Sequence, residues 1–415
     1  MTATSRPDPS PDLSHTVAVL LAGGRGTRLH ELTRAECKPA VHFTTGHRIA
    51  DFTMANAARS GLSRMVVATQ HCPGTLSRHL AAVWAGAFAP GGLIQRDGHA
   101  VAGQRGYRGT ADALRANIDL LDAMGAREVV VLAGDHVYAM DYAPMVAAHR
   151  AAGAEVTVAT LAVPLAAARD FGVIATEDGG RITGFAEKPK SPVAQPGHPG
   201  HALASMGIYV ASWPWLRALL RDDAGLADLG HDVMPLAAAA GQAFAYAMPA
   251  GENGEPPYWR DVGTLDAYRQ AVLEFGQRPP PVPRPLVPGV VPRLLPDVAV
   301  AASRFSAQRA FGGLRLCVPR LGAGDRRRWT VLDETILMPG ARVAPGVRLA
   351  RCIVAPGTAI PDGLVAGEDR AEDARWFRVT EAGTTLITTA MLARRHALRG
   401  SGPVPHPALP LLRTV

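Results

Sequence analysis

Three short apolar segments, set far apart in the chain, constrain its fold more than any other feature. They span residues 17–22, 65–69 and 128–133, and each is followed at once by glycine or a polar residue. Unbroken apolar runs of this length are typical of strands that are buried on both faces, as in parallel sheets. Ligands bind beyond the carboxyl ends of such strands, so the residues just after the three runs are the first candidates for a site.

Helical patterns between these runs favour an α/β fold. Residues 110–124 predict an amphipathic helix, with Ala113, Ile118 and Leu121 as its candidate core positions. Strands that alternate with helices form a mostly parallel sheet covered by helices. We therefore expect one α/β domain over residues 16–277, preceded by a flexible N-terminus over residues 1–15.

The remainder of the chain has a different character. Residues 278–296 are rich in proline and keep no amphipathic period, which predicts an extended linker. Beyond it, small and β-branched residues recur at roughly six-residue spacing, with Pro-Gly or glycine at 339–340, 345–346, 356–357 and 363. This pattern favours a short left-handed parallel β-helix over a generic small β domain. We expect residues 297–415 to form this shortened β-helix domain and a C-terminal tail.

Composition excludes several classes of protein. The formal charge is +7, and the basic residues are scattered except for short clusters at 326–328 and 394–395, which disfavours a nucleic-acid partner. No apolar run approaches the ~20 residues that span a bilayer, so we expect no membrane partner. The first residues lack the pattern of a signal peptide, and the four cysteines form no metal or disulfide spacing. We expect a cytoplasmic protein.

A glycine-rich segment follows the first apolar run and predicts a phosphate-binding loop. Its sequence over residues 21–29 is LAGGRGTRL, and Lys38-Pro-Ala follows shortly after. Glycines let backbone N–H groups approach phosphates closely, and Arg25, Arg28 and Lys38 add positive charge. Neither the Walker A pattern nor the dinucleotide-binding GxGxxG pattern is present. The segment is therefore a candidate triphosphate site of another kind.

Two carboxylates are candidates for holding a metal ion. Asp135 comes directly after the third apolar run and a glycine, and Asp261 lies in the segment Trp-Arg-Asp-Val-Gly. Two oxygen ligands, completed by water and phosphates, suit Mg²⁺. The alternative is that Asp135 forms a turn and Asp261 a surface ion pair.

The ordered set of motifs resembles the nucleotidylyltransferases that act on sugar 1-phosphates. Several later segments resemble the glucose-1-phosphate adenylyltransferase branch of that family. They are RIADF at 48–52, YRGTADA at 107–113, LAGDHVY at 132–138, FAEKP at 185–189, LASMGIY at 203–209 and YWRDVGT at 258–264. The resemblance covers nearly all of the first domain and the tail from Glu381 to Leu392, and leaves residues 280–328 without a clear counterpart.

The resemblance implies a Rossmann-like domain that transfers the adenylyl group of ATP to glucose 1-phosphate, with Mg²⁺, in a homotetramer. It places catalytic roles on Arg28, Lys38, Asp135 and Lys188, and metal ligation on Asp135 and Asp261. The implied nucleotide-binding residues are Ala22, Gly23, Gly24, Arg25, Gly26, Thr27, Gln95, Gly109 and Thr110. The implied sugar-binding residues are Tyr107, Gly172, Glu187, Lys188, Ser205 and Asp228. Gln70 is a weaker candidate for the same pocket, and His42 and His136 are interpreted as structural or peripheral.

Cationic positions outside this set depart from the family. Relatives are controlled by fructose 1,6-bisphosphate and AMP through cations that are replaced in this chain by Ala35, Glu36, Ala123, Pro356, Thr389 and Ala393. His42 and Arg48 are retained. A phosphate site that loses cations and gains a carboxylate repels its ligand, which predicts weak regulation.

Three alternatives are weighed against this interpretation. The chain could use another nucleotide or sugar, although YRGTADA and SMGIY disfavour this. It could be one subunit type of a hetero-oligomer, either active or purely structural. The presence of Asp135, Lys188 and Asp261 argues against an inactive subunit. A β-helix acyltransferase is disfavoured because the helix is short and offers no plausible catalytic histidine.

Overall fold

The computed structural model describes residues 11–44, 46–251, 254–276, 279–286, 315–317 and 330–399. Most of the expected N-terminus, most of the linker, the basic cluster at 326–328 and the end of the tail therefore lie outside the described residues. Residues 12–15 belonged to the segment expected to be flexible, yet Leu13 is buried and the backbone oxygen of Asp12 accepts a hydrogen bond from Arg150 at 2.9 Å.

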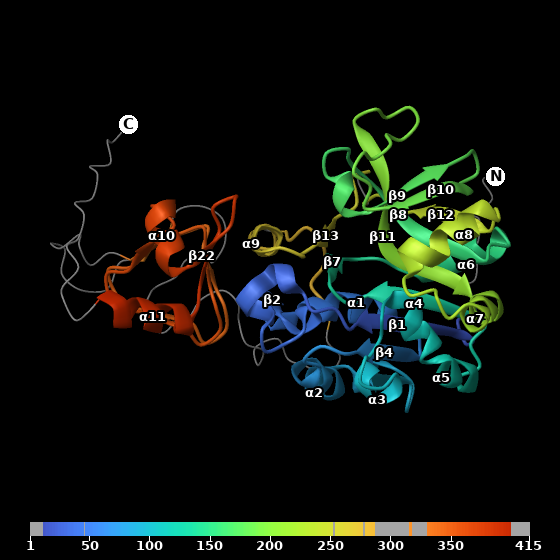
Figure 1. Cartoon of the computed structure of the whole chain (residues 1–415), viewed down its shortest axis with the longest axis horizontal. Coiled ribbons are helices and arrows are strands. Elements are labelled where there is room, and N and C mark those ends of the chain that lie inside the picture. The colour runs from blue at the N-terminus through green and yellow to red at the C-terminus, as the bar shows by residue number, and fades with distance from the viewer. Residues whose placement is uncertain are drawn as a thin grey trace, which may run out of the picture.

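A parallel core of four strands carries the larger domain (Figure 1). The three apolar runs are neighbouring strands in the order β6-β1-β4, with β5 at the edge. Val19 of β1 lies opposite Val131 of β6 and Val66 of β4, in parallel register. The prediction of a mostly parallel buried sheet is confirmed. The bounds are β1 Thr16–Ala22, β4 Met65–Thr69, β5 Leu93–Asp97 and β6 Glu128–Ala133.

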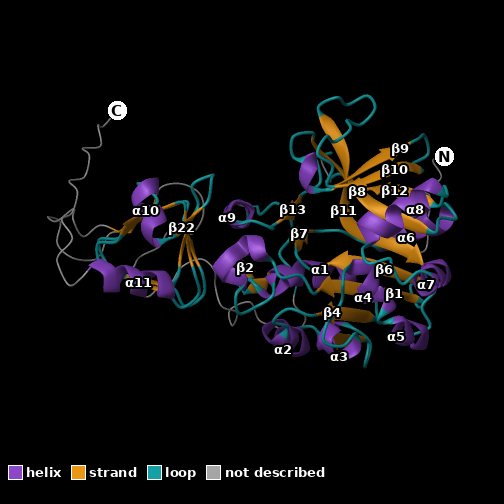
Figure 2. Ribbon diagram, viewed as in Figure 1, coloured by secondary structure: helices purple, strands orange, loops and turns teal. Residues whose placement is uncertain are grey.

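Alternate residues of these strands pack into two separate cores, because side chains point to opposite faces of a strand. Ala18 and Leu20 face the first core, whereas Val17 and Val19 face the second. Helices α1, α2 and α6 contribute to the first core, and α4, α5, α7 and α8 to the second (Figure 2). The helix bounds are α1 Ile49–Arg59, α2 Gly74–Val83, α3 Gly98–Val101, α4 Thr110–Arg115, α5 Ile118–Ala123, α6 Ala143–Ala151, α7 Trp213–Asp222, α8 Met234–Ala239 and α9 Leu265–Glu274.

The helix expected over residues 110–124 is broken into α4 and α5. Asn117 lies at the break, fully buried, and its side-chain amide donates to the backbone oxygen of Ala113 at 2.7 Å. An asparagine that bonds the backbone in this way competes with helical hydrogen bonding. The predicted core positions Ala113, Ile118 and Leu121 are all buried.

An antiparallel extension continues the sheet beyond β6. Strand β11 pairs antiparallel with β6, β8 and β9, β10 pairs antiparallel with β9, and β12 alone is parallel to its neighbour β8 among these pairs. The bounds are β8 Val156–Pro164, β9 Gly172–Thr176, β10 Ile182–Glu187, β11 His201–Ser212 and β12 Ala243–Ala247. Two small ribbons lie outside this sheet, β2 His42–Thr44 with β3 His47–Arg48 and β7 His136–Tyr138 with β13 Trp259–Asp261. Short helical turns are η1 Thr27–Thr33, η2 Lys38–Ala40, η3 Ala85–Ala87, η4 Ala168–Asp170 and η5 Leu229–Val233.

The C-terminal domain is a stack of parallel coils, as the hexapeptide spacing predicts. Ile336 of one coil pairs with Ile353 of the next in parallel register, and Ile353 pairs with Leu386 of the third. The third coil is interrupted by α10. The bounds are β14 Arg315–Cys317, β15 Thr330–Asp333, β16 Ile336–Leu337, β17 Arg342–Val343, β18 Arg348–Ala350, β19 Cys352–Val354, β20 Ala359–Ile360, β21 Val365–Ala366, α10 Arg370–Trp376, β22 Arg378–Val379, β23 Thr385–Ile387 and α11 Thr389–Arg399.

The two domains meet through a shared apolar core and ion pairs. Figure 1 shows the C-terminal domain, in orange and red, at the end of the molecule near α9 and β2. Ile336, Ile353 and Leu386 of the coils pack in one cluster with Phe275 and other residues of the larger domain. Along the same boundary, Arg378 of β22 meets Glu31 of η1 at 2.6 Å. None of the helices in the described part of the chain is both long and apolar enough to cross a bilayer.

Candidate active site

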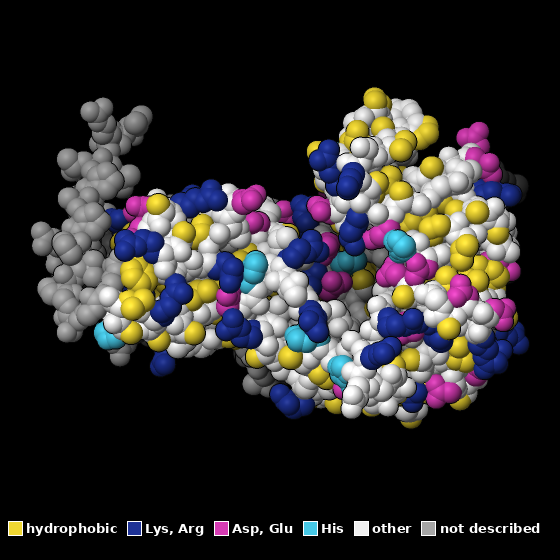
Figure 3. Space-filling view, viewed as in Figure 1, with side chains coloured by type: hydrophobic (Ala, Val, Ile, Leu, Met, Phe, Trp, Pro, Cys, Tyr) yellow, Lys and Arg dark blue, Asp and Glu magenta, His cyan; other side chains and the backbone are white. Residues whose placement is uncertain are grey.

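A cleft of about 660 Å³ lies at the carboxyl ends of β1, β4 and β6, between the parallel core and the antiparallel extension. In Figure 3 the larger domain is hollowed where basic, acidic and histidine side chains gather. This is the edge at which parallel sheets bind ligands. The predicted site residues that line it are Ala22, Gly23, Gly24, Arg25, Gly26, Thr27, Arg28, Lys38, Tyr107, Gly109, Thr110, Asp135, Gly172, Glu187, Lys188, Ser205, Asp228 and Asp261.

The glycine-rich loop leaves β1 and enters η1 through Gly26. The φ of Gly26 is 61°, and a Cβ there would lie 2.8 Å from the Cβ of Lys38. Both the left-handed backbone and the close approach require glycine at this position. Arg25 and Arg28 are exposed at the mouth of the cleft, and the Arg28 guanidinium comes no closer than 3.8 Å to Asp261. The loop therefore offers open backbone and two cations to an anionic ligand.

Lys38 lies buried at the floor of the cleft and contacts both candidate metal ligands. Its Nζ is 2.9 Å from Asp135 and 2.7 Å from Asp261, and its side chain is 6% exposed. Burial by itself would lower the pKa of Lys38, but the two neighbouring carboxylates raise it above its ordinary value. Burial likewise opposes ionisation of Asp135, yet the charges of Lys38 and His136 hold its pKa below the usual range. Lys38 and Asp135 are therefore both ionised at neutral pH.

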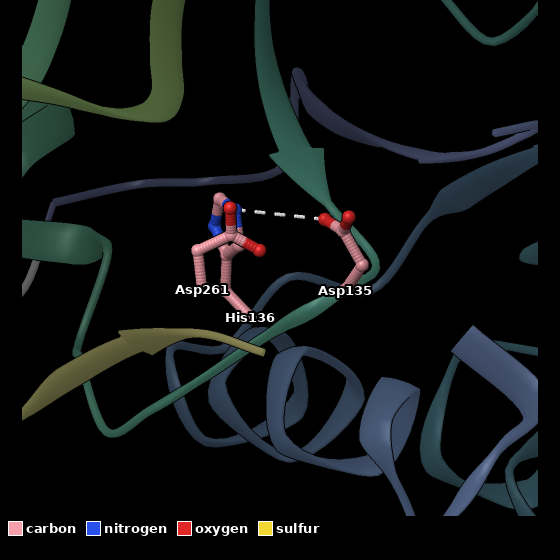
Figure 4. Close-up of side chains that lie close together, drawn as sticks. All are labelled: Asp135, His136 and Asp261. Carbon is pink, nitrogen blue, oxygen red and sulfur yellow. Dashed lines mark ion pairs between the residues drawn. The ribbon is translucent and has the colours of Figure 1, made fainter. Parts of the chain in front are cut away.

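Two strands far apart in the sequence bring Asp261 to Asp135. Strands β13 and β7 pair antiparallel, with Asp261 opposite His136, the residue after Asp135. Ligand atoms of Asp135, His136 and Asp261 lie within 4.8 Å of one another. Figure 4 shows the three side chains turned toward one another, with His136 Nε2 3.6 Å from an oxygen of Asp135. The two carboxylates share one ammonium, so this donor set suits a divalent cation.

His136 is closer to the chemistry than the sequence indicates. Its Nδ1 is buried and has no hydrogen-bond partner among the described residues, while its ring packs edge-on against Trp259. From the sequence, His136 was expected to be structural or peripheral. Its position directly after Asp135 was the available signal.

The opposite wall of the cleft carries the Glu-Lys-Pro segment at the end of β10. The Lys188 ammonium lies 2.9 Å from Glu187, and the Lys188 side chain is 63% exposed. Lys188 adopts a φ of 45°, and its backbone N–H donates to the oxygen of Phe171. A Cβ on Gly172 would lie 3.0 Å from a Glu187 oxygen, so glycine makes room for this carboxylate.

Tyr107 and Ser205 complete the lining between the two walls. The Tyr107 backbone N–H donates to the Gln70 side-chain oxygen at 2.6 Å. Gln70, the weaker candidate for the pocket, follows β4 and also lines the cleft. Ser205 Oγ accepts a hydrogen bond from the Gly207 backbone at 3.2 Å.

Gln95 is the exception among the predicted nucleotide-binding residues. Its side-chain amide donates to the backbone oxygen of Ser77 at 3.2 Å. The described residues that line the cleft do not include it. Gln95 lies within β5, whereas the loops that reach the cleft follow β1, β4 and β6, so the structure does not bring Gln95 to the site.

Comparisons with known proteins agree with this geometry. The family model described as nucleotidyl transferase matches residues 17–278, and the model described as GlmU-like, C-terminal hexapeptide matches residues 325–387. The hexapeptide match and the parallel coils confirm the predicted β-helix.

Curated relatives match the chain over nearly its whole length. A protein named glucose-1-phosphate adenylyltransferase from Jannaschia sp. (strain CCS1) is 39% identical over 411 residues, covering 92% of this chain and 97% of the relative. Proteins of the same name from Cereibacter sphaeroides (strain ATCC 17029 / ATH 2.4.9) and Paraburkholderia phymatum are 38% and 37% identical, covering 93% of this chain and 97% and 98% of their own lengths. The chain therefore belongs to the nucleotidyl transferase family and, within it, to the family of glucose-1-phosphate adenylyltransferases.

Proposed function

We propose that this protein transfers the adenylyl group of ATP to glucose 1-phosphate, which gives ADP-glucose, a glucosyl donor for α-glucan synthesis, and pyrophosphate. The observation that carries the proposal is the convergence of Asp135, Asp261 and Lys38 beside the glycine-rich loop. Membership of the adenylyltransferase family supports the choice of substrates.

The reaction requires the protein to position the substrates and to stabilise charge. No side chain forms a covalent bond to a substrate. A phosphate oxygen of glucose 1-phosphate attacks the α-phosphorus of ATP, the bond to the β-phosphate breaks, and pyrophosphate leaves with the bonding electrons. The nucleophile is already ionised, so no general base is needed. Arg25, Arg28 and Lys188 line the cleft, and we assign the two arginines to the departing phosphates and Lys188 to the sugar phosphate. Fixed cations stabilise the negative charge that develops in the transition state.

Asp135 and Asp261 are the residues proposed to hold Mg²⁺. Their carboxylate oxygens converge, and the Lys38 ammonium contacts both. An ion bound there would neutralise phosphate charge and polarise the phosphoryl oxygens. His136 borders the site, but Mg²⁺ prefers oxygen ligands and water, so we do not include it among the ligands.

The remaining roles divide along the two walls of the cleft. We assign the nucleotide to the backbone of residues 22–27 and the sugar to Glu187, Ser205 and the loop around Asp228. Tyr107 lies between these walls.

We also propose that the chain forms a homotetramer, as the resemblance implies. Analytical ultracentrifugation of the purified chain measures the mass of the assembly and so tests this proposal.

A panel of substrates tests the proposal. Purified protein is assayed for pyrophosphate release with ATP, GTP, UTP and dTTP, each against glucose 1-phosphate, galactose 1-phosphate and mannose 1-phosphate, with Mg²⁺. We expect the highest kcat/KM for ATP with glucose 1-phosphate, and ADP-glucose as the product. Equal or faster turnover with another nucleotide would overturn the substrate assignment, and no turnover with any pair would point to a dependent subunit of a hetero-oligomer.

A further inference from the structure

Thr110 was expected to bind the nucleotide, yet its hydroxyl already forms hydrogen bonds to other groups of the protein. Its Oγ1 donates to an oxygen of Asp228 at 3.0 Å and accepts from the backbone N–H of Leu229 at 2.7 Å. A threonine hydroxyl has one proton, and the Asp228 carboxylate accepts it. Thr110 therefore has no proton left to donate to ATP in this arrangement.

The first turn of α4 is closed by the same loop, residues 226–232, which we call the sugar loop. The backbone N–H groups of Ala111 and Asp112 both donate to the oxygen of Ala227, at 2.9 and 3.1 Å. These are the donors that a helix leaves unpaired at its N-terminus. A Cβ on Gly109 would lie 2.4 Å from the Ala227 oxygen, so glycine permits this close contact.

These contacts fix the carboxylate of Asp228. Its Oδ1 accepts from the backbone N–H groups of Gly230 and His231, at 2.9 and 3.0 Å, while its Oδ2 accepts from Thr110. The far side of the sugar loop lies against Glu187, since a Cβ on Gly230 would be 2.8 Å from a Glu187 oxygen. The sugar loop thus joins α4 to the wall that carries Glu187 and Lys188.

We propose that Thr110 is a positioning residue for the sugar, acting through Asp228 and the sugar loop, and that its side chain makes no contact with the nucleotide. The inference rests on the proposed function for the identity of the sugar phosphate. Oδ1 already accepts two hydrogen bonds, whereas Oδ2 keeps a lone pair for a sugar hydroxyl, and Thr110 determines where Oδ2 points. Loss of the Thr110 hydroxyl should therefore weaken sugar binding and leave ATP binding nearly unchanged.

The test compares Thr110→Val, Thr110→Ser and wild type by steady-state kinetics in both substrates. Val keeps the shape and removes the hydroxyl. We expect its KM for glucose 1-phosphate to rise roughly three- to ten-fold, the range for loss of one hydrogen bond, with less than about two-fold change in KM for ATP. Ser should restore the wild-type value. Thr183→Val is the matched control, because Thr183 is exposed and its hydroxyl meets only a backbone oxygen of β9 among the contacts found.

A rise confined to ATP, an equal rise for both substrates, or no rescue by Ser would overturn the proposal. Thr110→Ala is made in parallel and supplies the same split of KM values if the valine variant melts below the assay temperature. Wild-type turnover in the same assays separates the two claims. A wild type that uses a different sugar phosphate corrects the proposed function, and the Thr110 test then runs with that sugar.

Discussion

Charged groups are used differently in the cleft and at the boundary between the two domains. In the cleft, one buried ammonium on Lys38 contacts two carboxylates, and the exposed Arg28 adds a longer ion pair to Asp261 at 3.8 Å. At the boundary, Glu31 and Glu334 each meet a guanidinium of their own. Glu31 accepts two hydrogen bonds from Arg378, at 2.6 and 2.8 Å, and Glu334 lies 2.9 Å from Arg269.

The difference distinguishes carboxylates that can bind a metal ion from carboxylates that hold the two domains together. The cleft carboxylates share one buried ammonium and keep free lone pairs for a metal ion, whereas each of the two boundary carboxylates bonds a guanidinium of its own. Glu36 stands at a position where relatives carry an effector-binding cation. It lies 3.3 Å from Arg48, so it too is a carboxylate paired with one guanidinium. Residue types alone do not distinguish these two uses of charge, whereas the ion pairs in the structure do.

The largest effect is expected in the cleft. Asp135→Asn keeps the shape of the side chain but removes a charged oxygen ligand, so we expect kcat to fall by on the order of 10²–10³ with the fold intact. Circular dichroism and initial rates measure this, with Asp178→Asn, an exposed aspartate in a turn, as the control. Activity within a few-fold of wild type would rule out the metal role.

Lys188 provides the next largest effect, on the sugar side alone. Lys188→Gln removes the exposed cation from that wall, and we expect KM for glucose 1-phosphate to rise roughly ten-fold or more, as for a lost charged hydrogen bond, with a much smaller change for ATP. Lys190→Gln, an exposed neighbour, should behave as wild type. Parallel increases for both substrates would place Lys188 elsewhere in the reaction.

The boundary should respond in stability instead of catalysis. Arg378→Ala breaks a pair in which Arg378 is 40% exposed, so we expect a loss of about 0.5–1 kcal/mol in the free energy of unfolding and unchanged KM values. The hydrogen bond that Glu31 accepts from Arg378 holds the pKa of Glu31 below its ordinary value of 4.5. A lowered folded-state pKa contributes stability above the unfolded pKa, and this contribution is lost as the pH falls through the folded pKa.

Urea unfolding of wild type and Arg378→Ala at neutral pH and again below pH 4.5 measures both points. Arg370→Ala, at an exposed arginine of α10, is the matched control. A kinetic defect in Arg378→Ala without a change in stability would show that this pair serves the cleft.

The smallest effect is expected for effectors of relatives. Glu36 pairs with Arg48, and the other replaced positions, Ala35, Ala123, Pro356, Thr389 and Ala393, carry no charge. An effector that binds neither state shifts nothing. We expect less than roughly two-fold activation by fructose 1,6-bisphosphate and little inhibition by AMP, below the usual coupling. Strong activation in an initial-rate titration would show that other cations rebuild the site.

Local patterns in the sequence predict the parallel core and the loops that follow it, because buried strands and glycine turns depend on neighbouring residues. The antiparallel extension was not predicted, because β11 pairs with β6 and β8 over long separations in the sequence. The same limit explains His136, which meets Asp261 only through the pairing of β7 with β13. Asn117, which breaks the expected helix, and Thr110, which bonds Asp228, act through contacts that periodicity does not record.

The Mg²⁺ dependence of the rate tests most directly whether the two cleft carboxylates, Asp135 and Asp261, hold the metal. Initial rates at saturating ATP and glucose 1-phosphate are measured against free Mg²⁺ for wild type, Asp135→Asn, Asp261→Asn and the Asp178→Asn control. We expect half-saturating Mg²⁺ to rise by on the order of ten-fold or more in both cleft variants, with the control unchanged. Identical Mg²⁺ dependence in all four proteins would contradict the account.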